Sequence, residues 1–382
     1  MKPSVLNRRQ FSVGVGAAAV GGFGLARAQS EGRIVLGQSA PFSGPAAQLG
    51  IQFNQGAKLF FDQLNAAGGV GKRTVEIRTL DDGYEPDRCA ENTRKLIADD
   101  VFALFGYVGT PTSMAALPLF TQAKLPFFAP FTGAESLRQP FNRLVFHVRA
   151  SYYDETALIV RQLVNLGLKK IAVFHQNDAY GKAGLDGVNK ALTEQKLALV
   201  AAATVERNSV DVAAAVEKLV AAKPDAVVQI AAYGASAAFV RAARKAGFGG
   251  TFYNVSFVGT QALADELGKD GAGVVVSQVV PSPYQPSRQI TREFLEAIKK
   301  GSDKVQANYS SMEGFVAARI FTEGLRQALG SGKITRDSLI SGLEGLGTQV
   351  ISGYPVSFGP NDHSASHFVE MSMLTGDGRV RT

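Results

Sequence analysis

Short apolar runs that suit β-strands alternate with stretches of helical period along nearly the whole chain. The run Ile171–Phe174 is apolar throughout, which is typical of a parallel strand buried on both faces of its sheet. Strands that alternate with helices of about 10–15 residues predict parallel sheets with helices on both sides. The alternation ends near residue 148 and then restarts. The sequence therefore predicts an α/β fold of two doubly wound parallel-sheet lobes.

The expected elements follow from the apolar period and from the Gly and Pro breaks between runs. Strands are expected at 34–39, 75–80, 101–105, 126–129 and 144–148, and then at 170–175, 200–205, 226–230, 251–255 and 274–280. Helices are expected at 50–67, 86–98, 111–124, 152–166, 184–196, 212–222, 235–246, 287–300, 310–329 and 335–346, with a short helix near Leu263 and a strand-rich tail to Leu374.

In doubly wound sheets, ligands bind beyond the carboxyl ends of the strands. The loops at those ends are rich in Gly, Ser, Thr, Tyr and Phe and poor in charge. No loop offers a nucleophile with a base beside it, and the chain has no G-x-S-x-G elbow. This pattern favours a binding protein with no catalytic residues over an enzyme. The loops are 40–49, 106–112, 130–135, 176–181, 231–236, 256–260 and 281–286.

The first 28 residues have the three parts of an export signal. Lys2, Arg8 and Arg9 make a basic start, a small apolar run follows, and the segment closes on an A-x-A cleavage site at Ala28. The Arg8-Arg9 pair resembles a twin-arginine signal. The alternative is an N-terminal membrane anchor, but the apolar run is about 15 residues and a span needs about 20. We expect a mature, periplasmic chain cleaved after Ala28.

The composition of the chain argues against several classes of binding partner. Four of the 40 Lys and Arg residues and none of the 33 Asp and Glu residues lie in the signal, so the remaining chain carries 36 basic against 33 acidic residues, or +3. The basic residues do not cluster, which argues against nucleic acid. Cys89 is the single cysteine, so no intramolecular disulfide is expected. His363 and His367 are four apart, but the segment does not suit a helix, and we expect no metal and no cofactor.

A set of short strings resembles one family in order along residues 31–345. The chain is similar there to the leucine/isoleucine/valine-binding-protein-like substrate-binding proteins of branched-chain-amino-acid-type ABC transporters. These proteins have the type I periplasmic binding fold. The strings are IVLG at 34–37, PFSGP at 41–45, Gly50, GAK at 56–58, NAAGGV at 65–70, DDGYEP at 81–86, PFFAP at 126–130, NDAYG at 177–181 and FVRAAR at 239–244.

The resemblance implies a hinge of three crossovers between the lobes. The crossovers are expected near 148–150, 280–286 and 345–351. The N-terminal lobe then comprises 29–148 and 281–345, and the C-terminal lobe comprises 149–280 and 346–382. A ligand held between the lobes would stabilise the closed form of such a hinge.

The resemblance also assigns the ligand's carboxylate to the first lobe. Positions matching Thr110, Phe131 and Gly133 bind it in the family. Gly133 lacks the hydroxyl that the family often has there, and the adjacent Thr132 can substitute. Thr110 and Thr112 also begin a helix, whose N-terminus carries partial positive charge. An ordinary helix cap is the alternative role for Thr110.

Further candidate ligand contacts come from the first loop and from the second lobe. Ser43 precedes a helix and can present a hydroxyl and free N–H groups to an anion, and Leu49 lies in the same loop. Tyr180, Tyr233 and Tyr309 match or adjoin aromatic positions of the family. Tyrosine gives an apolar face with one polar tip, which suits a cleft that closes over a small ligand. Simple packing is the alternative for each.

One departure from the family pattern bears on the ligand. Amino-acid binders carry an acidic residue in the loop after the strand at 251–255, where it pairs with the ligand's ammonium. Here Phe257 stands at that position. A buried ammonium without a partner costs about several kcal/mol, and neither Glu313 nor Asp178 is obviously placed to replace it. Phe257 is therefore an expected contact of an aromatic or aliphatic carboxylate, or of a keto acid.

Together these features predict an exported, monomeric, two-lobed protein that captures a small carboxylate-bearing solute and delivers it to an ABC permease. A ligand sensor of the same fold is one alternative, and an exported amide hydrolase is another. We expect no nucleic-acid partner and no direct membrane insertion of the mature chain.

Overall fold

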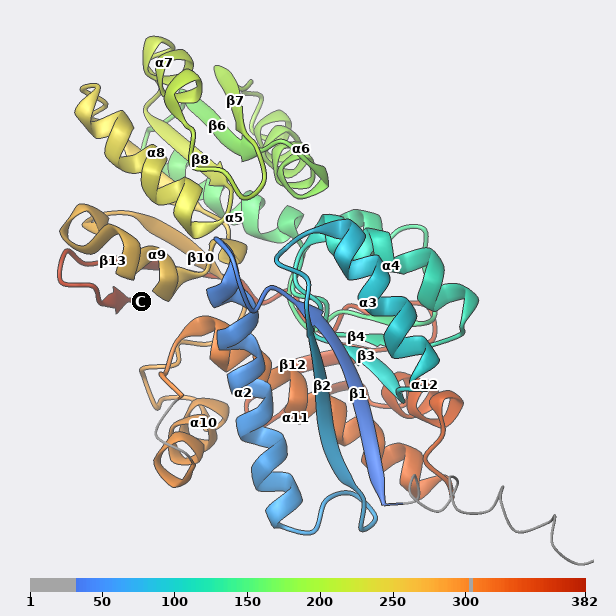
Figure 1. Cartoon of the computed structure of the whole chain (residues 1–382). Coiled ribbons are helices and arrows are strands. Elements are labelled where there is room, and N and C mark those ends of the chain that lie inside the picture. Colours follow the sequence, from blue (N-terminus) through green and yellow to red (C-terminus); the bar gives the residue numbers. More distant parts are fainter. Residues whose placement is uncertain (1–31, 302–304) are drawn as a thin grey trace, which may run out of the picture.

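The computed structural model describes residues 32–301 and 305–382. The export signal and the cleavage after Ala28 are predictions that lie outside these residues. The described chain forms two α/β lobes, each built on its own sheet (Figure 1). The two-lobe, parallel-sheet prediction is confirmed. Within the described ranges, no helix is long and apolar enough to cross a membrane.

The first lobe has a five-stranded parallel sheet in the order β2-β1-β3-β4-β5. Its strands are β1 (Arg33–Ala40), β2 (Thr74–Asp81), β3 (Ala103–Phe105), β4 (Phe127–Phe128) and β5 (Val145–Phe146). Its helices are α2 (Ala47–Ala66), α3 (Pro86–Ala98), α4 (Thr110–Gln122), α10 (Gln289–Lys300), α11 (Tyr309–Gly330) and α12 (Arg336–Glu344), with the short 3-10 turn η1 (Glu135–Leu137).

Two apolar layers cover the two faces of this sheet. Successive strand residues point to opposite faces, so Phe127 packs on Phe120 of α4 at a ring-centroid distance of 4.7 Å, whereas Phe128 packs on Phe321 of α11 at 5.1 Å. Helices α3 and α4 lie on one side of the sheet, and α2 and α11 on the other (Figure 1). The sheet is therefore buried on both faces, as its apolar strands predict.

The second lobe has a seven-stranded sheet in the order β14-β13-β10-β9-β8-β6-β7. Strand β13 pairs antiparallel with both β10 and β14, and the other pairings are parallel. Its strands are β6 (Ile171–Gln176), β7 (Ala201–Val205), β8 (Ala226–Ile230), β9 (Thr251–Asn254), β10 (Val275–Gln278), β13 (Glu370–Leu374) and β14 (Val380–Arg381). Its helices are α5 (Tyr152–Asn165), α6 (Ala179–Glu194), α7 (Ala213–Ala221), α8 (Tyr233–Lys245) and α9 (Thr260–Leu267), with 3-10 turns η2 (Ser256–Val258) and η3 (Gly268–Gly271).

The C-terminal segment differs from the expected division of the lobes. Residues 346–382 were expected in the second lobe, but the hairpin β11 (Gly347–Ile351) and β12 (Tyr354–Phe358) and the loop after it pack on the first lobe. Phe358 lies 5.4 Å from Phe146 between ring centroids, and His363 stacks on the same ring at 3.7 Å. The chain joins the sheet of the second lobe at β13. Burial of this apolar contact holds the hairpin to the first lobe.

Candidate functional site

The first crossover carries a buried ion pair between the lobes. Arg149 follows β5, and its Nε and Nη2 atoms donate to the two carboxylate oxygens of Glu313 on α11, both at 2.8 Å. The two side chains are 1% and 5% exposed. The guanidinium also lies 4.2 Å from the centroid of the Phe131 ring. Removing either charge would leave the other buried and uncompensated, so this pair fixes the crossover against α11.

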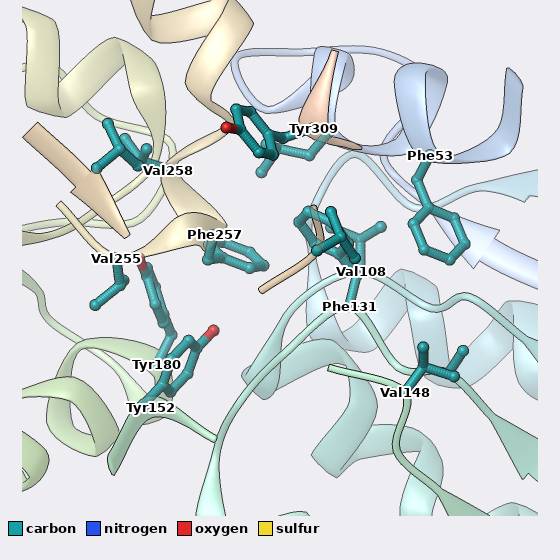
Figure 2. Close-up of a cluster of buried hydrophobic side chains, with 14 of the residues drawn as sticks. Phe53, Val108, Phe131, Val148, Tyr152, Tyr180, Val255, Phe257, Val258 and Tyr309 are labelled. Atoms are coloured by element: carbon teal, nitrogen blue, oxygen red, sulfur yellow. The ribbon is translucent and has the colours of Figure 1, made fainter. Parts of the chain in front are cut away.

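Phe257 lies at the centre of an aromatic cluster between the lobes (Figure 2). Its ring comes from η2 of the second lobe and lies 5.6 Å from Phe131 and 6.0 Å from Tyr84, both of the first lobe. On its own lobe it lies 4.4 Å from Tyr180. Phe257 is fully buried. The residue that stands at the family's acidic position thus makes an apolar contact across the cleft.

Three buried hydroxyl groups form a hydrogen-bonded set beside Phe131. The Oγ1 atoms of Thr110 and Thr132 lie 2.7 Å apart, and Thr132 donates to the Tyr152 hydroxyl at 3.3 Å. Thr110 therefore donates to Thr132, which leaves the Tyr152 proton free for another acceptor. Burial raises the pKa of Tyr152, so its hydroxyl keeps that proton. Donors beside the N-terminus of α4 suit an oxyanion.

Gly133 has no room for a side chain. A Cβ at this position would lie 2.7 Å from the backbone nitrogen of Tyr152. The Gly133 carbonyl also accepts a hydrogen bond from the N–H of Tyr152 at 2.8 Å. The chain that leaves the first crossover therefore packs directly against Gly133. A side chain that carries the hydroxyl often found here in the family cannot be accommodated, and Thr132 provides a hydroxyl at the preceding position.

Tyr180 presents a buried polar tip without a partner among the described residues. Helix α6 was expected from residue 184, but it begins at Ala179 because Asp178 Oδ1 accepts from the N–H groups of Tyr180 and Gly181 and caps the helix. This earlier start places Tyr180 in the first turn, facing Phe257. Burial raises the pKa of Tyr180 well above its ordinary value, so the hydroxyl stays a donor. An unsatisfied buried hydroxyl costs about 1–3 kcal/mol.

Leu49 and Tyr309 also reach the region between the lobes. Leu49 on α2 packs so closely on the turn after η2 that a Cβ at Gly259 would lie 2.5 Å from its Cδ2 atom. Tyr309 is the first residue of α11 and is 4% exposed. Its ring lies 5.9 Å from Tyr284, and it borders the cluster in Figure 2.

Three sequence-predicted contacts lie apart from the cluster. Ser43 is exposed and donates its hydroxyl to Asp81 at 2.5 Å. Thr112 is buried, but its hydroxyl donates to the carbonyl of Val108, so it serves the turn that begins α4. Tyr233 lines a separate cavity of about 430 Å³ together with Gly44 of the first lobe. None of these three residues belongs to the cluster around Phe257.

The structure adds two residues that the sequence reasoning missed. Tyr84 is fully buried, and its hydroxyl accepts from Gln176 Nε2 of the second lobe at 3.3 Å. Tyr152 completes the hydroxyl set. Signals for both were present. Tyr84 lies in the DDGYEP string directly after a strand, and Tyr152 begins the helix that follows the first crossover.

The two acidic side chains that were weighed as partners for an ammonium group, Glu313 and Asp178, are already engaged. Glu313 is paired with Arg149 through both oxygens. Asp178 caps α6 through Oδ1, and its Oδ2 accepts from Gln176 at 2.5 Å. Neither carboxylate is left to pair with a ligand's ammonium group.

A polar contact also joins the lobes at the cleft entrance. Glu85, just before α3, accepts from Arg207 at 3.0 Å and from Asn208 at 2.7 Å, both in the loop after β7. Asn208 Nδ2 also lies 3.1 Å from the carbonyl of Gly83. These three contacts join the two lobes directly in this structure.

The two histidines that were considered as metal ligands, His363 and His367, lie in different surroundings. His363 is buried, and its Nδ1 lies 3.0 Å from the carbonyl of Val145. His367 is exposed, and its Nδ1 lies 3.1 Å from Asp154. In the part of the chain that the structure describes, no group of three His, Cys, Asp or Glu side chains is arranged to hold a metal ion.

Comparison with known proteins decides the family. The family model described as periplasmic binding protein matches residues 33–379. The chain belongs to this periplasmic binding protein family. A Leu/Ile/Val-binding protein homolog from Brucella melitensis is 26% identical over 378 residues, covering 93% of this chain and 92% of the relative. The chain is thus a type I periplasmic binding protein of the leucine/isoleucine/valine type.

Solved structures agree with this family. A possible leucine/isoleucine/valine-binding protein from Rhodopirellula baltica is 36% identical, with a TM-score of 0.85, covering 92% of this chain and 96% of that one. A substrate-binding periplasmic protein from Ralstonia solanacearum is 32% identical, with a TM-score of 0.84, covering 91% and 99%. Both structures share the fold of this periplasmic binding protein over nearly its whole length.

Proposed function

We propose that this periplasmic binding protein captures a small carboxylate without an amino group and delivers it to an ABC permease. The observation that carries the proposal is Phe257. At the position where amino-acid binders of the resemblance carry an acid, a buried ring packs on Phe131 and Tyr180. The surrounding carboxylates Glu313 and Asp178 have other partners. An ammonium buried here would lack a counter-charge, at a cost of about several kcal/mol.

The buried hydroxyl groups at the cleft support a ligand that carries a carboxylate. The free proton of Tyr152, backed by Thr132 and Thr110, would donate to a carboxylate oxygen. The unpartnered hydroxyl of Tyr180 offers a second donor for a keto or hydroxyl oxygen. Phe131 and Phe257 would enclose an aliphatic or aromatic body. A branched-chain 2-oxo acid or an aromatic carboxylate combines these features.

Closure and delivery complete the proposal. The mature chain would be exported by its twin-arginine-type signal, act as a periplasmic monomer and close by hinge motion over the ligand. The contact of Glu85 with Arg207 and Asn208 supports a closed form in which both lobes share the site. The permease would then receive the solute from this closed form.

The deciding experiment compares two probes that differ at one group. Binding of 4-methyl-2-oxopentanoate and of L-leucine to residues 29–382 would be measured by isothermal titration calorimetry, with phenylacetate as an aromatic carboxylate. We expect the oxo acid or phenylacetate to bind and leucine to bind at least about a hundredfold more weakly. A double Thr110→Val, Thr132→Val variant should no longer bind the carboxylate ligand. Tight binding of leucine would overturn the proposal.

A further inference from the structure

Glu155 is a fully buried carboxylate that the ligand contacts above do not use. It lies in the first turn of α5. Its Oε2 accepts from the Ser256 backbone N–H at 2.7 Å and from the Ser277 hydroxyl at 2.6 Å, and its Oε1 accepts from the Ser256 hydroxyl at 3.0 Å. An ionised carboxylate can accept hydrogen bonds at every site of its two oxygens, whereas a protonated carboxyl group loses one of these sites to its own proton. The three donors therefore match the charged form.

These donors lead directly to the cleft. Ser256 is the first residue of η2 and precedes Phe257 in the chain. Ser277 lies in β10, which runs into the second crossover. Helix α5 itself begins two residues after Ala150, at the first crossover. One side chain thus connects the turn that carries Phe257 to the chain segments at the first and second crossovers.

We propose that Glu155 is a positioning residue for ligand recognition: its ionised carboxylate fixes the turn 256–258 so that Phe257 faces the ligand. The inference rests on the proposed function, because it takes the cleft as the ligand site. Glu155 itself does not touch the ligand, since its oxygens are occupied by donors of its own lobe.

The charged and titratable groups around Glu155 set the pH at which it acts. Arg149 faces it from the first crossover, Tyr152 from its own helix and Tyr180 from α6. Burial raises the pKa of Glu155, and the charge of Arg149 and the serine donors only partly oppose this. Proton uptake therefore occurs at a less acidic pH than for an exposed glutamate. Because the bound form requires the ionised carboxylate, ligand affinity should fall as the pH falls through this pKa.

The positioning can be tested without any ligand. The Ser256 amide proton donates to Glu155 at 2.7 Å, so its chemical shift in an amide-resolved NMR spectrum reports the charge on that carboxylate. In the wild-type chain we expect this resonance to titrate at a less acidic pH than an exposed glutamate would give. In Glu155→Gln the titration should vanish, and amide exchange of residues 256–258 should accelerate.

The ligand arm measures the dissociation constant of 4-methyl-2-oxopentanoate against pH. Glu155→Gln should weaken binding about tenfold, the loss expected for a hydrogen bond to a charged group, and should remove the acid-side decline. Ser277→Ala keeps the charge but removes a donor, so it should raise the pKa of Glu155 and move the decline to higher pH. The control is Glu344→Gln on α12, which loses its 2.7 Å contact to Arg143 far from the turn and should leave the pH profile unchanged.

The two arms separate the two proposals. If the wild-type chain does not bind the oxo acid while the Ser256 resonance titrates as expected, the ligand class is wrong and the positioning of the turn stands. If Ser256 does not titrate, or if Glu155→Gln keeps the wild-type affinity and pH profile, the role of Glu155 is overturned. Should Glu155→Gln fail to fold, the direction of the shift in Ser277→Ala decides.

Discussion

At the scale of single residues, the proposed ligand class depends on Phe257. Replacing it with glutamate places a carboxylate against Phe131 and Tyr180, the surroundings that the ring now fills. Phe257→Glu should therefore raise the affinity for L-leucine by about tenfold or more relative to Phe257→Gln, which has the same size and no charge. Calorimetry of both variants with leucine and with 4-methyl-2-oxopentanoate checks this. Equal leucine affinity in the two variants would contradict it.

The same scale shows which site residues a sequence can predict. Thr110, Phe131 and Phe257 follow strand ends in a recognisable order, and the structure brings all three to the cleft. Ser43 has equally good local chemistry, but its hydroxyl is used by Asp81, which is 38 residues away. Glu155 carries no local signal, because its partners Ser256 and Ser277 are 101 and 122 residues away. Hydrogen bonds over such separations depend on the tertiary fold, which local pattern does not contain.

At the scale of elements, α2 and α11 cross so closely that two glycines are required. A Cβ at Gly56 would lie 1.7 Å from the Ser311 carbonyl oxygen, and one at Gly314 would lie 2.0 Å from the Phe53 carbonyl oxygen. Backbone atoms cannot move aside cheaply, so the helices would have to separate. This crossing matters for function because α2 carries Phe53, which packs edge-on to Phe131 at 5.6 Å.

Gly56→Ala should therefore lower the free energy of unfolding by about 3 kcal/mol, the upper part of the range for overpacking. Gly330→Ala, at the end of α11, is the matched control because nothing lies within 4 Å of its Cβ position. Alanine there should be neutral or stabilising by up to about 1 kcal/mol. Urea unfolding followed by circular dichroism measures both. Equal stability of the two variants would show that the helices separate without cost.

The order of helices and strands was predictable from the sequence, whereas the parts of the protein that each element packs against were less predictable. The alternating pattern predicted the order of strands and helices because each apolar period is local. The start of α6 was placed too late because the signal came from apolar residues, while the helix begins at the cap Asp178. The prediction that the hairpin 347–358 belongs to the second lobe is wrong. The alternation of apolar and polar residues in its strands shows that one face is buried, but it does not show which part of the protein covers that face. Phe146, about 210 residues earlier, is the residue that does so.

At the scale of the whole molecule, the lobes are joined by contacts of different kinds. The pair Arg149 and Glu313 is buried at the first crossover. Because Arg149 lies on the crossover itself, we expect the pair to be kept when the lobes separate. The contact of Glu85 with Arg207 lies at the entrance, where the side chains are 42% and 25% exposed. The entrance contact must break when the lobes separate, as must the contacts of Phe257 and Gln176 with the first lobe. It therefore contributes to the balance between the two forms.

Glu85→Gln should therefore shift this balance toward the open form. A partly exposed ion pair contributes about 1 kcal/mol or less, so the affinity for 4-methyl-2-oxopentanoate should fall by about threefold to fivefold, through faster dissociation. Added salt screens such a pair, so binding by the wild-type chain should weaken with ionic strength more than binding by the variant. Arg78→Gln is the control, because its 2.6 Å pair with Asp99 stays within the first lobe. Stopped-flow dissociation at low and high salt gives both quantities, and a variant with wild-type dissociation and salt dependence would mean that the entrance contact forms without holding the lobes together.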